Sequence, residues 1–531
     1  MGRRIVLIFT IFMVMLTALY IRVSYISWDK ELIEAGDEQN ILTLEAYSMR
    51  ANIYDRNFQK LVNEKEVYYA LIIPSETSAD FYEYFPPEKA EELSLLISRG
   101  MPFIYECSPE AENASGVTVY KGYERNNEEQ LCSNLIGYLS ETGDGVSGIE
   151  KAYNDYLREN GEVLKLSFMV NARGSLMGSK TAEIKKSGSG GAGVVLTIDK
   201  EIQKISEEAG SKIERGAVVV MDPFGGEILA LASFPKLDVL NLSAALSDEN
   251  SPFLNRAFSE YSPGSTFKLV VAAAALESGF SENEVIECLG EINLSGTSFR
   301  CHKEEGHGNL TIKSALENSC NPFFIELGKR VGFSLLYETA AKLGLGKGVD
   351  FGEGITSSAG HLPEKEEIKN PGDLANFSFG QGRLTVTPIQ LAAVVSAVVN
   401  SGKAPVPRLI KGYASSDGKG FSEVFEGGGY TECFSASTAN KLKEYMVSAV
   451  KNGTGILANP SRGAGGKTGS AETGQIGQSG TQIINAIFCG FYPAENPQYS
   501  IVVVCEDGVS GSVTAAPIFK EICEGIAALD G

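Results

Sequence analysis

An apolar run near the N-terminus constrains this chain more than any other feature of its sequence. It extends from Ile5 to Ile21 and directly follows Arg3 and Arg4. A helix of about 17 residues is roughly 26 Å long, slightly shorter than the ~30 Å hydrocarbon core of a bilayer. Because Val23 to Ile26 lengthen the apolar stretch, we predict one transmembrane helix over residues 5–26.

The basic residues before this run predict its orientation. Since positive charges stay on the cytoplasmic side, we expect residues 1–4 to form a cytoplasmic tail and residues 27 onward to lie outside the cytoplasm. A cleaved signal peptide is the alternative, but Leu16-Thr17-Ala18 has a large residue where the cleavage site needs a small one. We therefore favour an uncleaved signal anchor in the cell membrane, with a single pass.

The size and charge of the chain bound its class. Its 531 residues are too many for one ordinary domain, so two or three domains are expected. With 43% apolar and 21% charged residues, the chain can bury substantial cores. A net charge of −21 argues against a nucleic-acid partner, which requires a basic face.

The part of the chain after the apolar run divides at a Gly/Ser-rich stretch. We predict a hinge at residues 186–193, with one domain at residues 27–185 and another at residues 194–531. In the first domain, Tyr68–Ile73 is typical of a strand. Glu88–Ser98, preceded by two prolines, is typical of a helix.

The second domain shows antiparallel strands flanked by helices, which predicts an α+β fold. Asp199 is positioned to cap a helix over Lys200–Arg215, and a last helix is expected over Ala516–Leu529. The predicted strands are one at Val194–Ile198, a hairpin of Ala217–Met221 with Glu227–Ala232, and a hairpin of Asn485–Phe491 with Tyr499–Cys505.

Three short motifs occur in order in this domain: Ser265-Thr266-Phe267-Lys268, Ser319-Cys320-Asn321 and Lys467-Thr468-Gly469. Each is weak alone, since average composition predicts about two matches to the first motif by chance. The neighbourhood of the first motif is more specific. Pro263-Gly264 precedes it and the apolar stretch Leu269–Leu276 follows it, which predicts a buried helix that starts beside Ser265.

This setting predicts that Ser265 is a nucleophile and Lys268 its base. Lys268 lies one helical turn after Ser265, so its amine is expected to reach the serine hydroxyl without a histidine. An ordinary lysine with a pKa of about 10.4 is almost fully protonated at neutral pH. Burial and a second cation, Lys467, are expected to lower that pKa. Ser319 is predicted to relay a proton, and Asn321 to bind a substrate amide.

The third motif fits an edge strand. Lys467 and Thr468 can hold a substrate carboxylate, and Gly469 allows a substrate backbone to come close. Such a strand can pair with an extended peptide by β-augmentation. The backbone N–H groups of Ser265 and Ser470 are expected to form an oxyanion hole.

Cysteine and histidine give no clear metal pattern. The chain has nine cysteines and three histidines but no CxxC pair, which disfavours a zinc ribbon or a thioredoxin-type site. Cys288 and Cys301 flank a predicted hairpin, where either a disulfide or two free thiols are consistent with an extracytoplasmic location. His302 and His307 lie nearby, but their spacing is irregular. We therefore predict no metal and no cofactor.

Longer stretches around the motifs resemble one family. They are Gly216–Pro235, Asn255-Arg256, Tyr261–Lys268, Gly380-Gln381-Gly382, and Thr385, Thr387, Pro388 and Gln390. Together with the ordered motifs, they resemble the penicillin-recognising serine transferases, and most of all a class B penicillin-binding protein, a monofunctional transpeptidase. This resemblance covers residues 194–531. Upstream, Arg50–Leu61 and Gly148-Ile149-Glu150 resemble boxes of the class B pedestal domain.

The resemblance implies a fold in which helices flank a five-stranded antiparallel sheet, with an N-terminal pedestal at residues 27–185. It implies a peptidoglycan D,D-transpeptidase: Ser265 attacks the penultimate D-Ala of a stem peptide, the terminal D-Ala leaves, and an amine of a second stem accepts the acyl group. β-Lactams would acylate Ser265 as substrate mimics. Gly380, Gln381 and Gly382 would either bind substrate or form only a structural loop. The implied partner is a SEDS-type glycan polymerase in the membrane.

Two rival functions stay open at this point. In a D,D-carboxypeptidase, water replaces the acceptor amine, and no residue in the sequence decides between the two acceptors. A non-catalytic activator or scaffold of a glycan polymerase would tolerate loss of the three motifs, yet all three are intact.

Overall fold

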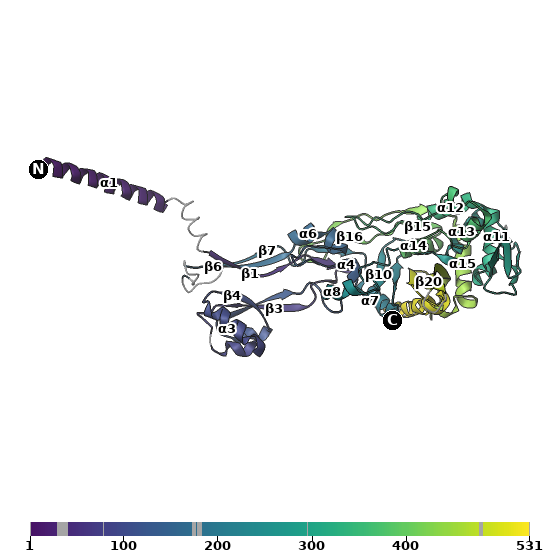
Figure 1. The fold of residues 1–531 in the computed structure, drawn as a ribbon, viewed down its shortest axis with the longest axis horizontal. Coiled ribbons are helices and arrows are strands. Elements are labelled where there is room, and N and C mark those ends of the chain that lie inside the picture. The colour runs from purple at the N-terminus through teal and green to yellow at the C-terminus, as the bar shows by residue number, and fades with distance from the viewer. Residues whose placement is uncertain are drawn as a thin grey trace. The chain divides into compact units, whose positions relative to one another are not determined.

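The computed structural model describes residues 2–28, 41–77, 79–171, 177, 183–294, 296–476 and 482–529. The chain forms two compact units (Figure 1). The first contains Met1–Arg50, Asn63–Arg125 and Glu159–Gly190, and the second contains Ala51–Val62, Asn126–Arg158 and Gly191–Gly531. Residues 27–185, expected to form one domain, therefore contribute to both units.

The predicted N-terminal helix is present as α1 (Gly2–Trp28), three residues longer at its start than the predicted span. The most apolar 18-residue window of α1 has a mean hydropathy of 2.3, and no residue of that window is buried. In the described part of the chain, α1 is the one helix that is long and apolar enough to cross a membrane.

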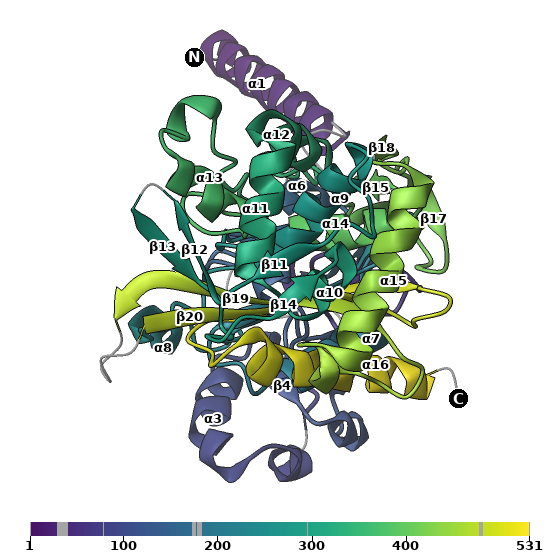
Figure 2. The same cartoon turned by 90° about the vertical axis from the view of Figure 1, so that its right-hand side faces the viewer.

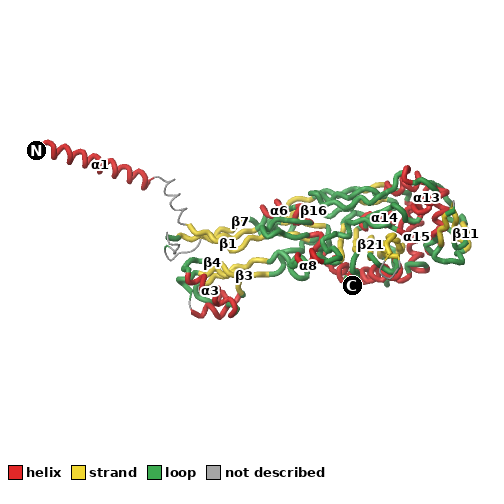
Figure 3. Tube along the Cα trace, in the orientation of Figure 1, coloured by secondary structure: helices red, strands yellow, loops and turns green. Residues whose placement is uncertain are grey.

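The first unit also holds two three-stranded antiparallel sheets, drawn in yellow in Figure 3. One has the order β1 (Ile41–Met49), β6 (Glu162–Met169), β7 (Glu183–Ser187), and the other the order β4 (Phe103–Cys107), β3 (Glu66–Ile72), β5 (Val117–Tyr123). Leu71, Leu164 and Leu166 are buried in a cluster that both sheets share. The strand predicted at Tyr68–Ile73 is β3.

Two predictions in this region need adjustment. The predicted helix at Glu88–Ser98 begins as a 3-10 turn over Pro87–Lys89 and becomes α-helical only in α3 (Ala90–Ser98). A proline at the first position suits such a start because it lacks the N–H that would be unpaired there. The predicted hinge is also shorter than residues 186–193, since β7 continues to Ser187 and pairs with β6 up to that residue.

The second unit is built on a five-stranded antiparallel sheet, which confirms the predicted fold class. The strand order is β10 (Ile228–Phe234), β9 (Gly216–Met221), β21 (Tyr499–Cys505), β20 (Gln482–Tyr492), β19 (Gly465–Ile476). Both predicted hairpins are therefore adjacent pairs in one sheet. β19 forms one edge, as predicted for the third motif.

Side chains of the central strands alternate between two buried faces, because successive residues of a strand point in opposite directions. In β9, Val218 and Val220 belong to the core that contains α7 (Lys200–Gly210) and α16 (Ala516–Leu529). Val219 and Met221 belong to the core that contains α14 (Pro388–Val399). Figure 2 shows α16 and α14 on opposite sides of the sheet.

The helix that Asp199 caps ends at Gly210, not at Arg215 as predicted. Asp199 does accept hydrogen bonds from the backbone N–H groups of Glu201 and Ile202. A β-carbon on Gly210 would lie 2.4 Å from the Phe234 ring, so the helix end packs tightly on β10. Residues 211–215 then form the connection between α7 and β9.

The second unit contains further α-helices. They are α4 (Ser133–Ile136), α5 (Gly148–Ala152), α6 (Asn154–Glu159), α8 (Leu242–Ser247), α9 (Lys268–Glu277), α10 (Ile312–Glu317), α11 (Asn321–Val331), α12 (Phe333–Lys342), α13 (Pro371–Ser378) and α15 (Ala436–Asn452).

Smaller sheets complete the second unit. One has four strands in the order β17 (Phe421–Val424), β16 (Ile410–Ala414), β8 (Gly193–Leu196), β2 (Asn52–Tyr54), and in it β2 and β8 run parallel. The two-stranded sheets are β11 (Ile286–Cys288) with β14 (Gly308–Leu310), β12 (Glu291–Leu294) with β13 (Thr297–Arg300), and β15 (Lys403–Pro405) with β18 (Tyr430–Glu432).

Candidate active site

Ser265 lies in a short 3-10 turn, Gly264–Phe267, that leads into α9. We predicted Ser265 at the start of the α-helix itself, but the α-helix begins three residues later, at Lys268. Gly264 enters the turn in the left-handed region, with a φ of 52°, and its N–H donates to the Gly380 carbonyl at 2.8 Å. The turn leaves Ser265 half-buried.

Two glycines pack so closely on this turn that neither has room for a β-carbon. A β-carbon on Gly469 would lie 2.9 Å from both the Pro263 oxygen and Thr266 Cγ2. One on Gly380 would lie 2.0 Å from the Gly264 oxygen, and Gly380 has a φ of 80°. Both glycines therefore have a packing role beside the nucleophile turn, in addition to any contact with substrate.

A buried ion pair fixes the segment before the turn. The Arg256 side chain is 4% exposed, and its Nε donates to Glu506 Oε1 at 2.9 Å. The Tyr261 hydroxyl donates to the same oxygen at 2.9 Å. Tyr261 also exchanges backbone hydrogen bonds with Val386, each 2.8 Å long. The family-like residues Arg256 and Tyr261 thus hold the approach to Ser265 in place.

Lys268 is completely buried, and its amine is directed at the second motif. Its Nζ donates to the Ser319 carbonyl at 2.7 Å and to Asn321 Oδ1 at 2.6 Å, and it lies 3.3 Å from Ser319 Oγ. Among the described residues, no hydrogen bond joins Nζ to the Ser265 hydroxyl, the contact that we predicted. The amine instead donates to the Ser319 carbonyl and Asn321 Oδ1.

Ser319 is the point where two lysines meet. Lys467 is also fully buried, and its Nζ donates to Ser319 Oγ at 2.9 Å. Ser319 has a φ of 51°, a left-handed conformation that is unusual for a serine and stores strain. Cys320 follows it and precedes α11, which starts at Asn321. The turn thus presents a carbonyl, a hydroxyl and an amide to the two amines.

Burial lowers the pKa of both amines. For Lys268, loss of solvent is the main cause, and the charge of Lys467 is the second; together they lower its pKa well below the usual 10.5. For Lys467, burial lowers the pKa to about 7. The charge of Lys467 disfavours protonation of Lys268, because two buried cations repel. The predicted neutral lysine is therefore consistent with the surroundings of Lys268.

The third motif lies on the edge strand β19. Thr468 is buried, and its hydroxyl is 2.9 Å from that of Thr454. The Lys467 amine also donates to the Thr468 carbonyl at 2.9 Å. Ser470 is exposed, and its Oγ accepts the Gly511 N–H at 3.1 Å. From Ser470 onward most residues of the strand are exposed.

The first two motifs and Ser470, which follows the third motif, contribute to a cleft of about 650 Å³. Five of the predicted site residues line it: Ser265, Asn321, Gln381, Gly382 and Ser470. The other predicted residues, Lys268, Ser319, Lys467, Thr468, Gly469 and Gly380, are not in its lining; they form the hydrogen-bond network and the packing just described.

Several residues in the cleft wall were not predicted from the sequence. They come from β13, from α13 with the loop after it, from the exposed part of β19 and from the start of β20: Ser298, Phe299, Arg300, Asn376, Phe379, Glu472, Thr473, Gly474 and Gln482. No local motif marks them, since only the tertiary fold brings them beside Ser265. Arg300 adds a cation and Glu472 an anion to a wall that is otherwise mostly neutral.

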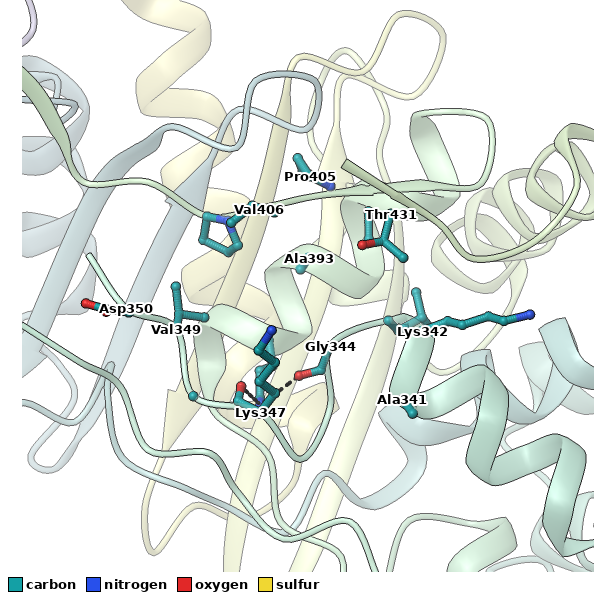
Figure 4. A pocket seen from close by; sticks show the side chains of 15 residues that line it. Ala341, Lys342, Gly344, Lys347, Val349, Asp350, Ala393, Pro405, Val406 and Thr431 are labelled. Atoms are coloured by element: carbon teal, nitrogen blue, oxygen red, sulfur yellow. Dashed lines mark hydrogen bonds between the residues drawn. The ribbon is translucent and has the colours of Figure 1, made fainter. Parts of the chain in front are cut away.

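A second cavity, of about 390 Å³, lies elsewhere in the unit and contains none of the three motifs (Figure 4). Gln390 in its wall donates from Nε2 to the carbonyls of Gly344, Lys347 and Ala359. Its Oε1 accepts the Thr387 N–H at 2.8 Å, which completes a capping box at the start of α14. These two family-like residues therefore have a structural role.

The sequence of the second unit matches a known protein family. The family model of the penicillin binding protein transpeptidase domain matches residues 216–524. The chain is 28% identical over 521 residues to stage V sporulation protein D of Bacillus subtilis, covering 89% of this chain and 77% of that protein. It is 31% identical over 376 residues to the peptidoglycan D,D-transpeptidase PbpA of Mycobacterium tuberculosis, covering 64% of this chain and 73% of that protein.

Solved structures of related proteins have the same fold as this chain. The D,D-transpeptidase domain of a peptidoglycan glycosyltransferase from Eggerthella lenta is 25% identical, with a TM-score of 0.66, covering 91% of this chain and 99% of that one. A chain from a peptidoglycan synthase complex has the same fold with a TM-score of 0.70, at 24% identity, and 99% of each chain is covered.

The family match spans more than half of the chain, from β9 to the last helix, and contains all three motifs. It thereby confirms the resemblance to class B penicillin-binding proteins. On the sequence match, the fold and the cleft together, the chain belongs to the penicillin-binding protein transpeptidase family of acyl-transferring enzymes.

Proposed function

We propose that this chain is a peptidoglycan D,D-transpeptidase with Ser265 as its nucleophile. One observation carries the proposal: Ser265 and Asn321 line the same cleft, and Asn321 accepts a hydrogen bond from the buried Lys268 amine. A nucleophile and a desolvated base are thus held at one wall of a site large enough for a peptide. The relatives named D,D-transpeptidase supply the substrate class.

The hydrogen bonds of Lys268 suit a neutral amine. Such an amine has two N–H donors and one lone pair, whereas an ammonium has three donors. The two short bonds, to the Ser319 carbonyl and Asn321 Oδ1, use both donors of the neutral form, and the third contact, with Ser319 Oγ, is longer at 3.3 Å. The lone pair is then available to a serine hydroxyl, which is what a general base needs.

The reaction follows from these positions. Lys268 takes the proton of Ser265 Oγ as that oxygen bonds to the carbonyl carbon of the penultimate D-Ala. Backbone N–H groups of Ser265 and Ser470 stabilise the oxyanion. The C–N bond to the terminal D-Ala breaks, and the proton passes through Ser319 to the leaving amine. An amine of a second stem peptide then attacks the ester, gives up a proton along the same route, and releases Ser265.

The edge strand β19 supports the binding of an extended stem peptide. An unpaired strand edge offers backbone groups that a substrate strand can use. Gly469 keeps the strand close to the nucleophile turn, and Gln381 and Gly382, which line the cleft, contact the substrate there. Penicillins enter the same cleft and acylate Ser265.

The membrane location follows from α1. The helix anchors the chain in the cell membrane, with the transpeptidase unit on the outer side, where peptidoglycan lies. Because the chain matches a component of a peptidoglycan synthase complex along 99% of its length, its partner is a membrane glycan polymerase of the SEDS type.

A synthetic lipid-linked substrate, polymerised by a separate glycan polymerase, tests the proposal. The full-length chain is expected to form cross-linked stem dimers, and Ser265→Ala is expected to form none. Ser262→Ala is the matched control, because Ser262 lies one turn earlier and donates only to the Leu384 carbonyl. Trimmed monomers without dimers would instead identify a D,D-carboxypeptidase. If Ser265→Ala gives the same products as the wild type, Ser265 does not catalyse the reaction, and only a non-catalytic role would remain for the chain.

A further inference from the structure

The cleft beside Ser265 contains two charged side chains that the proposed acyl transfer does not use. Arg300 is the one cation and Glu472 the one anion among the described residues of its lining. Both side chains are exposed, and within the described part of the chain the structure shows no ion pair and no side-chain hydrogen bond for either of them. A charge without a partner in the protein is available to a ligand.

Two different elements bring these charges to the cleft. Glu472 belongs to β19, and Arg300 is the last residue of β13. In Figure 2 the hairpin of β12 and β13 lies next to the end of β19, and residues of both elements line the cleft. Cys288 and Cys301 flank this hairpin as free thiols, the second of the two states that the sequence left open. The hairpin and β19 thus supply opposite charges to one cleft.

Neighbours on the two strands do not compete for these charges. Glu291 stands opposite Arg300 in the register of the hairpin. Its carboxylate accepts the Ser298 hydroxyl at 2.7 Å, and Glu291 is not in the cleft lining. Glu472 stands opposite Ile484 of β20, which is apolar. Both charged groups therefore keep their hydrogen-bonding capacity for a molecule in the cleft.

The position of Glu472 along β19 relates it to the reacting bond. Ser470 also lines the cleft, and its backbone N–H belongs to the proposed oxyanion hole. Ser470 and Glu472 are exposed on either side of the buried Ala471, as expected for side chains that alternate along a strand. Two residues span about 7 Å. A substrate strand paired with β19 therefore places a residue next to the reacting D-Ala beside Glu472.

The open part of β19 lies on one side of the reacting bond. Residues 467–469 are buried and are not in the cleft lining, whereas Ser470 and Glu472 to Gly474 are. The leaving group is a single D-Ala, while the remainder of the stem stays on the enzyme as the acyl group. The open part of the strand is thus the part with room for the acyl group. Glu472 then lies beside a stem residue that precedes the two D-Ala residues.

We propose that Glu472 and Arg300 bind the charged end of a diamino-acid side chain in the donor stem. The inference rests on the proposed function, in which an amine of one stem attacks the acyl group of another. Because both stems have the same structure, the donor carries such an amine as well, and Glu472 pairs with its ammonium form. Arg300 pairs with a carboxylate on the same side-chain end through two parallel N–H groups. The preferred donor is therefore zwitterionic at this end.

The rest of the cleft suits a polar chain. Its lining is mostly neutral and polar, with amides and hydroxyls from Ser298, Asn321, Asn376, Gln381, Thr473 and Gln482. Water solvates Arg300 and Glu472 when no zwitterion is bound, so an uncharged side chain is not excluded. Because both charges are exposed, each pairing should change the rate by about fivefold, the upper range for a surface ion pair.

Four matched penicillins test this subsite through the rate constant of acylation. Their acyl side chains have equal length and end in an α-amino-carboxylate, an amine alone, a carboxylate alone or a methyl group. We expect the full-length chain to react fastest with the zwitterionic penicillin. Glu472→Gln should slow the two penicillins that carry the amine by about fivefold, and Arg300→Gln should slow the two that carry the carboxylate by a similar factor. The methyl-ended penicillin should acylate all three chains at one rate.

Glu423→Gln is the matched control, because Glu423 is an exposed glutamate on the edge strand β17 and is not in the cleft lining. Its four rates should equal those of the wild type. Equal losses for all four penicillins in Glu472→Gln and Arg300→Gln would show a merely structural role and overturn the subsite. So would a wild-type chain that reacts equally with the zwitterionic and the methyl-ended penicillin.

Binding of stem peptides separates this subsite from the proposed reaction. Ser265→Ala has no nucleophile at this position, so fluorescence anisotropy of labelled stem peptides with the same four side-chain ends measures recognition alone. We expect the zwitterionic peptide to bind most tightly, and the added Glu472→Gln change to remove the advantage of the amine. That result in a chain which penicillin never acylates would refute the transpeptidase proposal and leave the subsite intact. Equal affinities for all four peptides would overturn the subsite, whether or not Ser265 is acylated.

Discussion

At the scale of single residues, the site depends on two buried lysines that share one serine. Lys268 and Lys467 are far apart in the sequence, yet both amines donate toward Ser319. Burial of two amines is costly unless at least one of them is neutral. The pKa of each is accordingly lowered, that of Lys467 to about 7.

This pair predicts a pH profile for acylation. Burial and then the charge of Lys467 lower the pKa of Lys268 well below 10.5, so the rate should rise with pH as Lys268 loses its proton and level off below pH 10.5. Lys467→Met removes the like charge, which raises the pKa of Lys268 and moves the rise to higher pH. The rate constant for penicillin acylation, measured against pH, checks this.

The control for that experiment is Lys313→Met, because Lys313 is a surface residue paired with Glu444. Its profile should coincide with that of the wild type. A profile of Lys467→Met that stays in place or moves to lower pH would contradict the assignment of Lys268 as the base.

Gly469 carries a second prediction. Its β-carbon would meet the Pro263 oxygen and Thr266 Cγ2, each at 2.9 Å, so Gly469→Ala should push the nucleophile turn away from β19. We expect acylation to slow by more than tenfold and the free energy of unfolding to fall by about 1–3 kcal/mol. Gly420→Ala, in an open loop, should change neither in the same assays. Unchanged acylation by Gly469→Ala would show that the turn tolerates the displacement.

At the scale of elements, α14 is positioned by its capping box. The Thr387 hydroxyl accepts the Gln390 N–H, and the Gln390 side chain accepts the Thr387 N–H and reaches three loop carbonyls. α14 packs on β21 and β9. Gln390 of the capping box thus connects the loops that contain Gly344, Lys347 and Ala359 to α14, and through α14 to the five-stranded sheet.

Thr387→Ala should therefore lower the free energy of unfolding by about 1 kcal/mol, the usual value of a helix cap. Thr387→Ser keeps the hydroxyl and should behave like the wild type. Denaturant unfolding of the two variants measures the difference. Equal losses for both would mean that the methyl group, not the cap, is what matters.

Local patterns in the sequence predict most elements of the catalytic unit but not their arrangement. Turn residues and apolar runs give both hairpins and the helix that Asp199 caps. They do not give the strand order, in which β9 lies beside β21 although nearly the whole unit separates them in sequence. Contacts of that kind depend on how complete strands pack.

The same limit applies within the site. The three motifs predict Ser265, Lys268, Ser319, Asn321 and Lys467, because each motif is short and its chemistry is local. The cleft residues Arg300 and Glu472, and likewise the thiols of Cys301 and Cys320, come together only in the tertiary fold. The 3-10 turn at Ser265 was also missed, since a helix start and a 3-10 turn share the same sequence signals.

At the scale of the whole molecule, the N-terminal helix predicts the membrane topology. Arg3 and Arg4 lie at the N-terminal end of α1, which the positive-inside rule keeps in the cytoplasm, so the full-length chain should sediment with membranes. Protease added outside intact spheroplasts should digest everything after the helix. A chain that is digested only after the membrane is broken would contradict this orientation.

The most direct test of the central claim is the site of the penicillin adduct. The full-length chain is incubated with penicillin and digested, and tandem mass spectrometry locates the modified residue. We predict a single penicilloyl ester on Ser265, absent from Ser265→Ala and present in Ser262→Ala. An adduct on another residue, or labelling that persists in Ser265→Ala, would contradict the assignment of Ser265 as the nucleophile.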